Sequence, residues 1–384
     1  SPKSTLLPSN FSLSMPPCMA MTLRVKRIRD FCGRLGIEVP LLSAPMTGIT
    51  TPELVAAVSN AGGLGILAAD LMSPEEIISA AAQTKRLTDR PFGINLRIPP
   101  RDRGSLEQAE KVAYALSDLR KELGLEEKVD FSRFSEPEFE SQLEAVLETG
   151  VPVVSCTFGG FREVYGEKLH QAGVYILGAA TTLREAKVQR AADSDAVILQ
   201  GVEAGGPRLY FESDPEEASV GLSVLLPEAA RALKLPLIAS GGIGSAFSVK
   251  GAMMAGASAV MVGSALACSP EAGAPKLMRD AMIAASDTAT CLTDLFSGRL
   301  ERVMKNGLIE ALSRAGVRSA GYPYQRYIMQ DMMEAAVRAG RQDLLRMPVG
   351  QAVNAFSCRS AAETLSEIRT ALLEVIELMD KEGK

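Results

Sequence analysis

Residues 235–264 read LPLIASGGIGSAFSVKGAMMAGASAVMVGS, and this stretch decides the fold. It contains two short apolar runs, Leu235–Ser240 and Ala257–Val262, and each run ends in a glycine-containing turn. Nearly continuous apolar runs are typical of strands that are buried on both faces, as in parallel sheets. Glycine after such a strand lets backbone N–H groups approach an anion closely. The stretch therefore indicates a parallel α/β fold with an anion site beside two of its strands.

The same pattern occurs six more times along the chain. The six runs are Pro40–Ala44, Leu64–Ala68, Phe92–Leu96, Val151–Cys156, Val174–Ala179 and Asp195–Gln200. Helical patterns lie between the runs, and two of them begin with a capping residue, a proline and an acid, at Thr51 and at Ser73. Eight successive β-then-α units predict an α/β fold of the (β/α)8 TIM-barrel type, with an added helical segment after strand eight.

The chain is expected to divide into four parts. Residues 1–22, rich in Ser, Pro and Met, predict a flexible tail. Residues 23–290 would form the barrel, with two charged helices inserted between residues 97 and 150. Residues 291–355 would form a helical insertion or lid, and residues 356–384 a C-terminal helix that packs on the barrel. Residues 329–333, which are rich in methionine, are compatible with a homo-oligomer interface, but packing within the chain is the preferred interpretation.

Composition narrows the possible partners. The net charge is −5 without a basic tract, which argues against nucleic acid as a partner. No uncharged apolar run is long enough for a membrane span, so no membrane association is expected. The six cysteines are scattered and there is one histidine, which argues against a disulfide framework and a metal site. We expect a small-molecule substrate and a reducing compartment. The cytoplasm, or an organelle lumen reached after removal of a targeting segment, is the expected location.

The two glycine turns are the strongest sign of a binding site. In TIM barrels, the loops after strands seven and eight often bind phosphate. Here these loops contain Ser240-Gly241-Gly242 and Gly263-Ser264. Ordinary tight turns remain the alternative for either turn alone. Two such turns on neighbouring strands favour a phosphate site.

Other segments are expected at the same end of the barrel. Ala44-Pro45-Met46 leaves the first strand and would lie against a ligand ring. Asn95 ends the third strand and Gln200 the sixth, which places two amide side chains at this face. Glu203 follows Gln200 in the loop, where a solvated charge is the simpler interpretation.

At these positions the sequence resembles the nitronate monooxygenase family, formerly called 2-nitropropane dioxygenases, and related flavin-dependent enoyl reductases. The resemblance covers residues 35–370. It is carried by Ala44-Pro45-Met46, Thr51-Pro52-Glu53-Leu54, residues 58–65 (VSNAGGLG), residues 91–96 (PFGINL), Val153-Val154-Ser155, residues 200–206 (QGVEAGG), residues 239–243 (ASGGI), residues 296–299 (FSGR) and Gly350-Gln351. It implies an FMN-binding barrel with an added helical part.

The resemblance also implies roles for individual residues. Ala44, Pro45 and Met46 would line the isoalloxazine ring, and Asn95 and Gln200 would reach the ring edge or the substrate. The cofactor-binding set is completed by Gly205, Gly206, Ser240, Gly241, Gly242, Gly263 and Ser264 around the phosphate or ribityl chain, and by Gln351 from the late segment.

One position departs from the family pattern. The usual catalytic histidine directly follows the double glycine, and here that position is Pro207. Proline has no titratable group, so the catalytic residue is unknown. Glu203, Arg208 and Tyr210 are the candidates in the same loop. The chain's one histidine, His170, is expected at the end of a helix near the amino-terminal face of the barrel.

The leading hypothesis is an FMN-dependent oxidoreductase, similar to nitronate monooxygenases, that oxidises a small anionic substrate with dioxygen as electron acceptor. A nitronate has already lost its carbon proton and needs no enzymic base, and Arg208 would hold such an anion. Two alternatives remain open: an NAD(P)H-dependent enoyl or quinone reductase, and a flavin-binding protein with a non-redox or lost activity.

Overall fold

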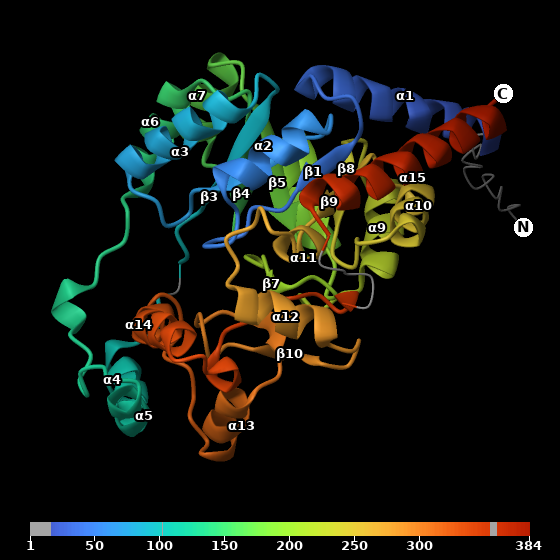
Figure 1. Ribbon diagram of the computed structural model, residues 1–384. Coiled ribbons are helices and arrows are strands. Elements are labelled where there is room, and N and C mark those ends of the chain that lie inside the picture. Colours follow the sequence, from blue (N-terminus) through green and yellow to red (C-terminus); the bar gives the residue numbers. More distant parts are fainter. Residues whose placement is uncertain (1–16, 102, 354–358) are drawn as a thin grey trace, which may run out of the picture.

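The computed structural model describes residues 17–101, 103–353 and 359–384, and eight parallel strands form its centre (Figure 1). They are β1 (Leu41–Ser43), β2 (Gly65–Ala68), β3 (Phe92–Arg97), β4 (Val153–Thr157), β5 (Tyr175–Ala180), β6 (Ala196–Gln200), β8 (Leu237–Ser240) and β9 (Ala259–Val262). Each of them falls on one of the eight apolar runs, which confirms the strand predictions.

The strands close into a barrel. Their order is β1-β9-β8-β6-β5-β4-β3-β2, and every neighbouring pair is parallel. A parallel bridge between Leu42 and Leu64 joins the two ends. Within it, the Leu64 N–H donates to the Leu41 carbonyl over 2.8 Å, and the Ser43 N–H donates to the Leu64 carbonyl over 3.1 Å. The predicted TIM barrel is thereby confirmed.

Helices surround the barrel between the strands. They are α2 (Pro52–Asn60), α3 (Pro74–Leu87), α6 (Phe139–Thr149), α7 (Glu163–Gln171), α8 (Leu183–Ala191), α9 (Leu222–Ala232), α10 (Ala246–Ala255) and the short α11 (Ser264–Ala267). The two predicted helix starts are confirmed, because the Thr51 hydroxyl accepts from the Leu54 N–H and Ser73 forms a capping box with Glu76.

The strands are apolar throughout because both of their faces are buried. In β1, Leu41 packs with Leu54 and Val58 of α2, whereas Leu42 packs with Leu64 and other side chains inside the barrel. All of these side chains are almost completely inaccessible to solvent. A strand that alternated polar and apolar residues would place its polar side chains in one of these two buried layers.

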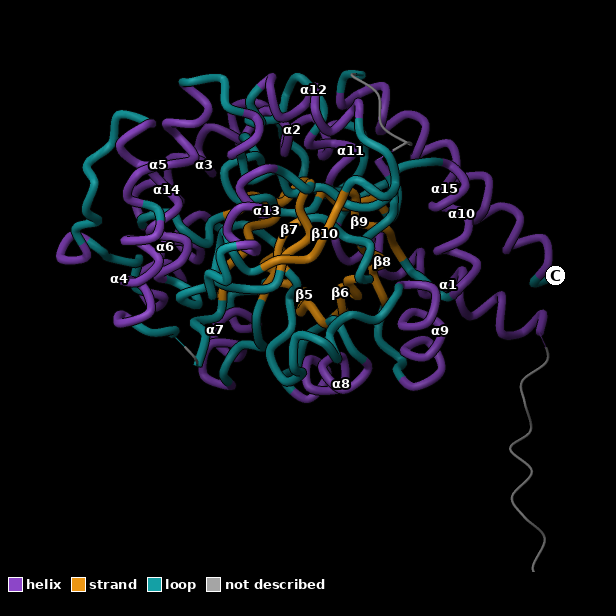
Figure 2. The backbone as a smooth tube through the Cα atoms, turned by 90° about the horizontal axis from the view of Figure 1, so that it is seen from below, coloured by secondary structure: helices purple, strands orange, loops and turns teal. Residues whose placement is uncertain are grey.

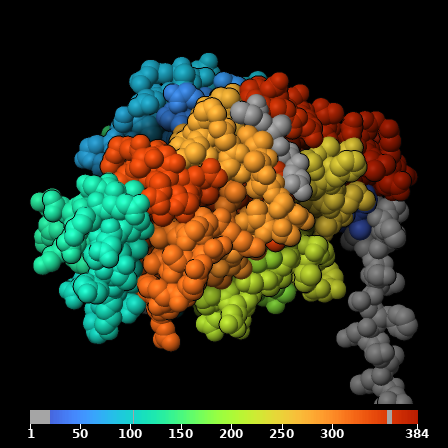
Figure 3. Space-filling view, turned by 60° about the horizontal axis from the view of Figure 1, so that its bottom comes forward, coloured from blue at the N-terminus to red at the C-terminus, as the bar shows by residue number. Residues whose placement is uncertain are grey.

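A cap covers the carboxyl ends of the strands (Figures 2 and 3). Its helices are α4 (Leu106–Ala115), α5 (Ser117–Glu122), η1 (Phe131–Arg133), α12 (Lys276–Ala284), α13 (Gly307–Arg314), α14 (Tyr324–Arg338) and η2 (Gln342–Leu344). It also contains a three-stranded antiparallel sheet of β10 (Thr290–Thr293), β11 (Glu301–Met304) and β7 (Gly206–Pro207). Met329 and Met332 of α14 are buried within the chain.

The cap therefore differs from the helical insertion predicted for residues 291–355. It includes two strands there, and α4 and α5 from the third β/α unit pack near α14 (Figure 1). β7 lies far from β11 in the sequence. A pairing between such distant segments produces no local sequence pattern from which it could be predicted.

The two ends of the described chain lie side by side (Figure 1). Helix α1 (Pro17–Leu35) packs along α15 (Ala361–Glu382), and the Thr22 hydroxyl donates to the Gly383 carbonyl over 2.8 Å. Helix α1 begins inside the predicted tail, because Val25 and Ile28 give it an apolar side to bury. Residues 1–16 lie outside the described residues. No helix in the described ranges is both long and apolar enough to cross a membrane.

Candidate active site

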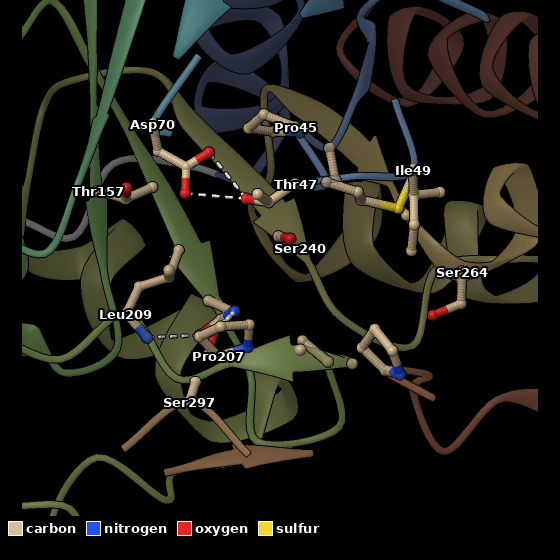
Figure 4. Close-up of a pocket in the computed structure, with 18 of the residues that line it drawn as sticks. Pro45, Thr47, Ile49, Asp70, Thr157, Pro207, Leu209, Ser240, Ser264 and Ser297 are labelled. Atoms are coloured by element: carbon tan, nitrogen blue, oxygen red, sulfur yellow. Dashed lines mark hydrogen bonds between the residues drawn. The ribbon is translucent and has the colours of Figure 1, made fainter. Parts of the chain in front are cut away.

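A cavity of about 500 Å³ lies between the carboxyl ends of the barrel strands and the cap (Figure 4). Loops that follow β1, β2, β4, β6, β8 and β9 line it on the barrel side, and residues from α14 line it on the cap side. Its volume is in the range of cofactor and ligand sites, about 300–1,000 Å³. The fold thus places a cavity where TIM barrels carry their chemistry.

The glycine turn after β8 offers backbone donors to this cavity. Gly241 and Gly242 have φ angles of 106° and 69°, which side chains other than glycine rarely adopt. The N–H groups of Gly241, Gly242 and Ile243 make no hydrogen bond within the described chain. Unbonded N–H groups at a cavity wall are suited to an anion. The Gly263-Ser264 turn lines the same wall, and the Ser264 hydroxyl accepts from the Gly350 N–H over 2.9 Å.

The segment after β1 is held in a fixed conformation. The Ala44 N–H donates to the Val262 carbonyl over 2.8 Å, and the Met46 N–H donates to the Thr50 hydroxyl over 2.9 Å. The Thr47 hydroxyl donates to the Asp70 carboxylate at 2.8 and 2.9 Å (Figure 4). Pro45 and Met46 therefore present an apolar surface of constant shape to the cavity.

The amide side chains of Asn95 and Gln200 differ in how many of their hydrogen-bonding groups remain free for a ligand. The Ser155 hydroxyl donates to Asn95 Oδ1 over 2.8 Å, and Asn95 Nδ2 has no partner among the described residues. Gln200 is used more fully. Its Nε2 donates to the Pro207 carbonyl over 3.0 Å, and its Oε1 accepts from Arg208 Nη1 and from the Leu209 N–H. Asn95 can donate to a ligand, whereas Gln200 chiefly holds the loop after β6.

The structure brings together every predicted cofactor-binding residue except one. Those that line the cavity are Ala44, Pro45, Met46, Asn95, Gln200, Gly205, Gly206, Ser240, Gly241, Gly242, Gly263 and Ser264. Gln351 is not among the lining residues. Its side chain is exposed, and its backbone N–H donates to the Glu203 carbonyl over 2.9 Å.

Sequence and structure comparisons identify the family to which this barrel and its cavity belong. A family model described as nitronate monooxygenase matches residues 30–370, which is most of the chain. The chain belongs to the nitronate monooxygenase family. It is accordingly an oxidoreductase, as the resemblance implied.

Individual relatives support the assignment. A "probable nitronate monooxygenase" of Staphylococcus aureus is 33% identical over 344 residues, covering 89% of this chain and 97% of the relative. The crystal structure of nitroalkane oxidase from Streptomyces ansochromogenes aligns with a TM-score of 0.83 and 30% identity, over 91% of this chain and 99% of that one. FabK from Thermotoga maritima, at 23% identity and a TM-score of 0.70, shares the fold over 92% of this chain and 98% of its own.

Pro207 occupies the position at which the nitronate monooxygenase resemblance implies a histidine. It lines the cavity and lies in β7, opposite Glu301 of β11. The following Arg208 N–H donates to the Leu300 carbonyl over 2.8 Å. The site therefore has a rigid apolar surface where an imidazole would stand.

Arg208 is a structural residue rather than a substrate-binding one. Its side chain is completely buried and donates to Gln200 Oε1 and to the carbonyls of Gly201, Gln200 and Ala218, over 2.6–3.0 Å. Burial lowers the pKa of Arg208 to about 10. The hypothesis that Arg208 holds an anionic substrate is not supported, because it does not line the cavity.

The other two candidate bases also lie outside the cavity lining. Both carboxylate oxygens of Glu203 accept from the Leu222 N–H at 3.0 and 3.1 Å, at the start of α9. The Tyr210 ring lies 4.2 Å from the Arg299 guanidinium carbon and borders a separate cavity. None of the three candidates faces the position of Pro207 from within the site.

Thr47, Asp70 and Arg97 are lining residues that the sequence motifs do not single out. They come from the ends of three consecutive strands, β1, β2 and β3. Arg97 Nη2 donates to Asp70 Oδ2 over 3.0 Å. A polar residue at or just after the end of an apolar run could have identified these three residues as candidates. The same feature identified Asn95 and Gln200. Among the described residues, no group of three or more His, Cys, Asp or Glu side chains is placed to hold a metal ion.

We expect His170→Ala to leave flavin content and turnover within about threefold of wild type, as for surface substitutions that change stability by about 0.5 kcal/mol or less. His170 lies in the last turn of α7, and its Nε2 is 3.0 Å from Asp195 Oδ2 at the amino-terminal end of β6. The visible spectrum and steady-state rates provide the measurement. A loss of activity of about 100-fold in a folded variant would contradict this placement.

Proposed function

We propose that this nitronate monooxygenase family member is an FMN-dependent oxidoreductase that oxidises a small anionic substrate, with dioxygen as the electron acceptor. The observation that supports it most directly is the cavity over the barrel, with unbonded backbone N–H groups on one wall and no free base at Pro207. The chemistry of the lining residues favours FMN as the cofactor, and the family favours dioxygen as the acceptor.

The residues present fit FMN. Gly241, Gly242 and Ile243 would hold the phosphate with their N–H groups, beside Gly263 and Ser264. A Cβ on Gly205 would lie 2.5 Å from the backbone of Val349, so the loop and the late segment approach as closely as glycine permits. When bound, FMN would supply a two-electron redox centre, which none of the described lining side chains provides.

The chain's own groups would position the substrate and exclude water. Pro45, Met46 and Pro207 form apolar lining on the barrel side, and Phe296, Met329 and Met333 form it on the cap side. Asn95 Nδ2 offers a neutral donor. The one carboxylate on the described lining, Asp70, is already bonded to Thr47 and Arg97. These groups give little help in removing a carbon proton, which suits a substrate that is already ionised.

The test begins with the purified or reconstituted protein, in which we expect one FMN per chain. Under anaerobic conditions, a preformed nitronate alone should bleach the flavin absorbance, whereas NADH and NADPH should not. Rapid bleaching by NADH or NADPH instead would favour an enoyl or quinone reductase. Retention of FMN without bleaching by either reagent would favour a non-redox role.

A further inference from the structure

We propose that Arg97 is the specificity-determining residue of this site, and that its guanidinium binds the charged end of a small planar oxyanion such as a nitronate or a carboxylate. The inference rests on the proposed function and deepens it, because it names the residue that selects the substrate's charge. Arg97 ends β3 and lines the cavity.

The guanidinium of Arg97 has unused donors inside the protein. Its side chain is 13% exposed, and Nη2 donates to Asp70 Oδ2 over 3.0 Å. Nε and Nη1 are buried and have no hydrogen-bond partner among the described residues. Buried donors without partners are rare and costly in native structures, so they usually have a ligand or a functional reason. An arginine donates only, so the missing partner is an acceptor, and an anion is favoured.

Two aromatic rings contact this guanidinium and restrict its position. Its central carbon lies 4.9 Å from the centre of the Phe158 ring and 4.5 Å from that of the Tyr322 ring. Phe158 directly follows β4 and has a φ of 65°, an unfavourable conformation for a bulky residue. The other neighbour of its ring is Arg299, at 4.5 Å. Backbone strain of this kind is found where structure holds a functional group in place.

The anion that Arg97 would bind is distinct from the cofactor phosphate. Around the barrel, β3 lies opposite β8, with β6, β5 and β4 on one side and β9, β1 and β2 on the other. The glycine turn follows β8, whereas Arg97 ends β3. Figure 4 shows the same separation, with Asp70 and Thr157 at one side of the pocket and Ser264 at the other. One cavity thus has two separate places for negative charge.

Other charged groups on the lining are engaged differently. Arg346 forms an ion pair of 2.6 Å with the fully buried Glu301. Arg326 comes from the cap helix α14; its Nε is likewise buried without a partner, and its Nη1 donates to Gln330 Oε1 over 3.4 Å. Arg97 is the lining arginine that belongs to a barrel strand and contacts two aromatic rings. Nη2 keeps a second N–H beside its bond to Asp70, from which an anion in the cavity can accept. Nε and Nη1 have no accessible surface, so a planar anion with two oxygens would engage them only after the guanidinium turns towards the cavity.

The test uses propionate and its neutral isostere propionamide as non-reacting probes, titrated into the FMN-loaded protein at constant ionic strength. Flavin absorbance and calorimetry report the two dissociation constants. We expect Arg97→Gln to weaken propionate binding at least about 10-fold, the scale of a charged hydrogen bond, and to leave propionamide binding unchanged. The propionate affinity of Arg97→Lys should lie between those of wild type and Arg97→Gln, because lysine keeps the positive charge but lacks the paired N–H donors of the guanidinium. Arg101→Gln is the matched control, since its side chain is 94% exposed in the same loop.

Three outcomes would overturn the proposal: no propionate binding by wild type, equal propionate binding by Arg97→Gln in a folded protein, or loss of FMN from Arg97→Gln. The last would assign Arg97 to the cofactor. The melting temperature of each variant identifies misfolding. If Arg97→Gln is misfolded, the propionate affinity of Arg97→Lys is compared with that of wild type instead. Calorimetry does not require flavin, so a protein that fails to bind FMN would refute the proposed function and still test this site.

Discussion

Wild-type protein is expected to oxidise a preformed nitronate about 100- to 10,000-fold faster than the corresponding neutral nitroalkane, the usual contribution of a general base. The anion has already lost its carbon proton, and only the neutral form needs a base beside the loop after β6. Pro207 occupies that place, and Glu203, Arg208 and Tyr210 are all engaged outside the lining. Initial rates with both forms of one nitro compound, measured side by side, test the expectation.

Pro207→His should raise the rate on the neutral form selectively. The Pro207 carbonyl accepts from Gln200 Nε2, and β7 pairs with β11, so the backbone is held from two sides and the new imidazole would face the cavity. Removal of proline also frees φ, which makes a partial gain reasonable. Pro207→Asn is the control, because asparagine is similar in size and is not a base. Equal use of both forms by wild type would contradict the expectation and make Asp70 the next base to examine.

Gly242→Asp is expected to weaken FMN binding at least about 100-fold. A carboxylate about 4 Å from a phosphate at a partly shielded site costs about 4 kcal/mol for each pair of charges. Space is not the obstacle, since a Cβ on Gly242 would lie 3.7 Å from Glu203 Cβ, an ordinary contact. Flavin content after reconstitution, and fluorescence titration with FMN, measure the effect.

Gly242→Asn separates charge from backbone strain. Asparagine has the same shape as aspartate, and both tolerate a positive φ such as the 69° of Gly242 better than other side chains do. We expect Gly242→Asn to retain FMN within about 10-fold of wild type, because it adds no charge. If Gly242→Asp and Gly242→Asn bind FMN equally well, the phosphate is not at this turn.

The sequence by itself determined the barrel and most of the cavity wall. Each barrel strand is a short apolar run, and several helices begin at a side-chain cap such as Thr51 or Ser73, so these elements follow from local patterns. All strands of a parallel barrel end at the same face. The sequence alone therefore predicts that Asn95, Gln200 and Gly242 lie around one site, as they do in the structure. The replacement of histidine by Pro207 is likewise visible in the sequence alone.

Only the tertiary structure decided which polar groups are available. Arg208 and Glu203 lie in the expected loop, but their hydrogen bonds go to backbone groups that folding places beside them. Arg97 meets Asp70 only because β2 and β3 are neighbours, and it is stacked on Tyr322, which lies far along the chain. A side chain's role depends on the partners that long-range packing supplies, and no local pattern records those partners.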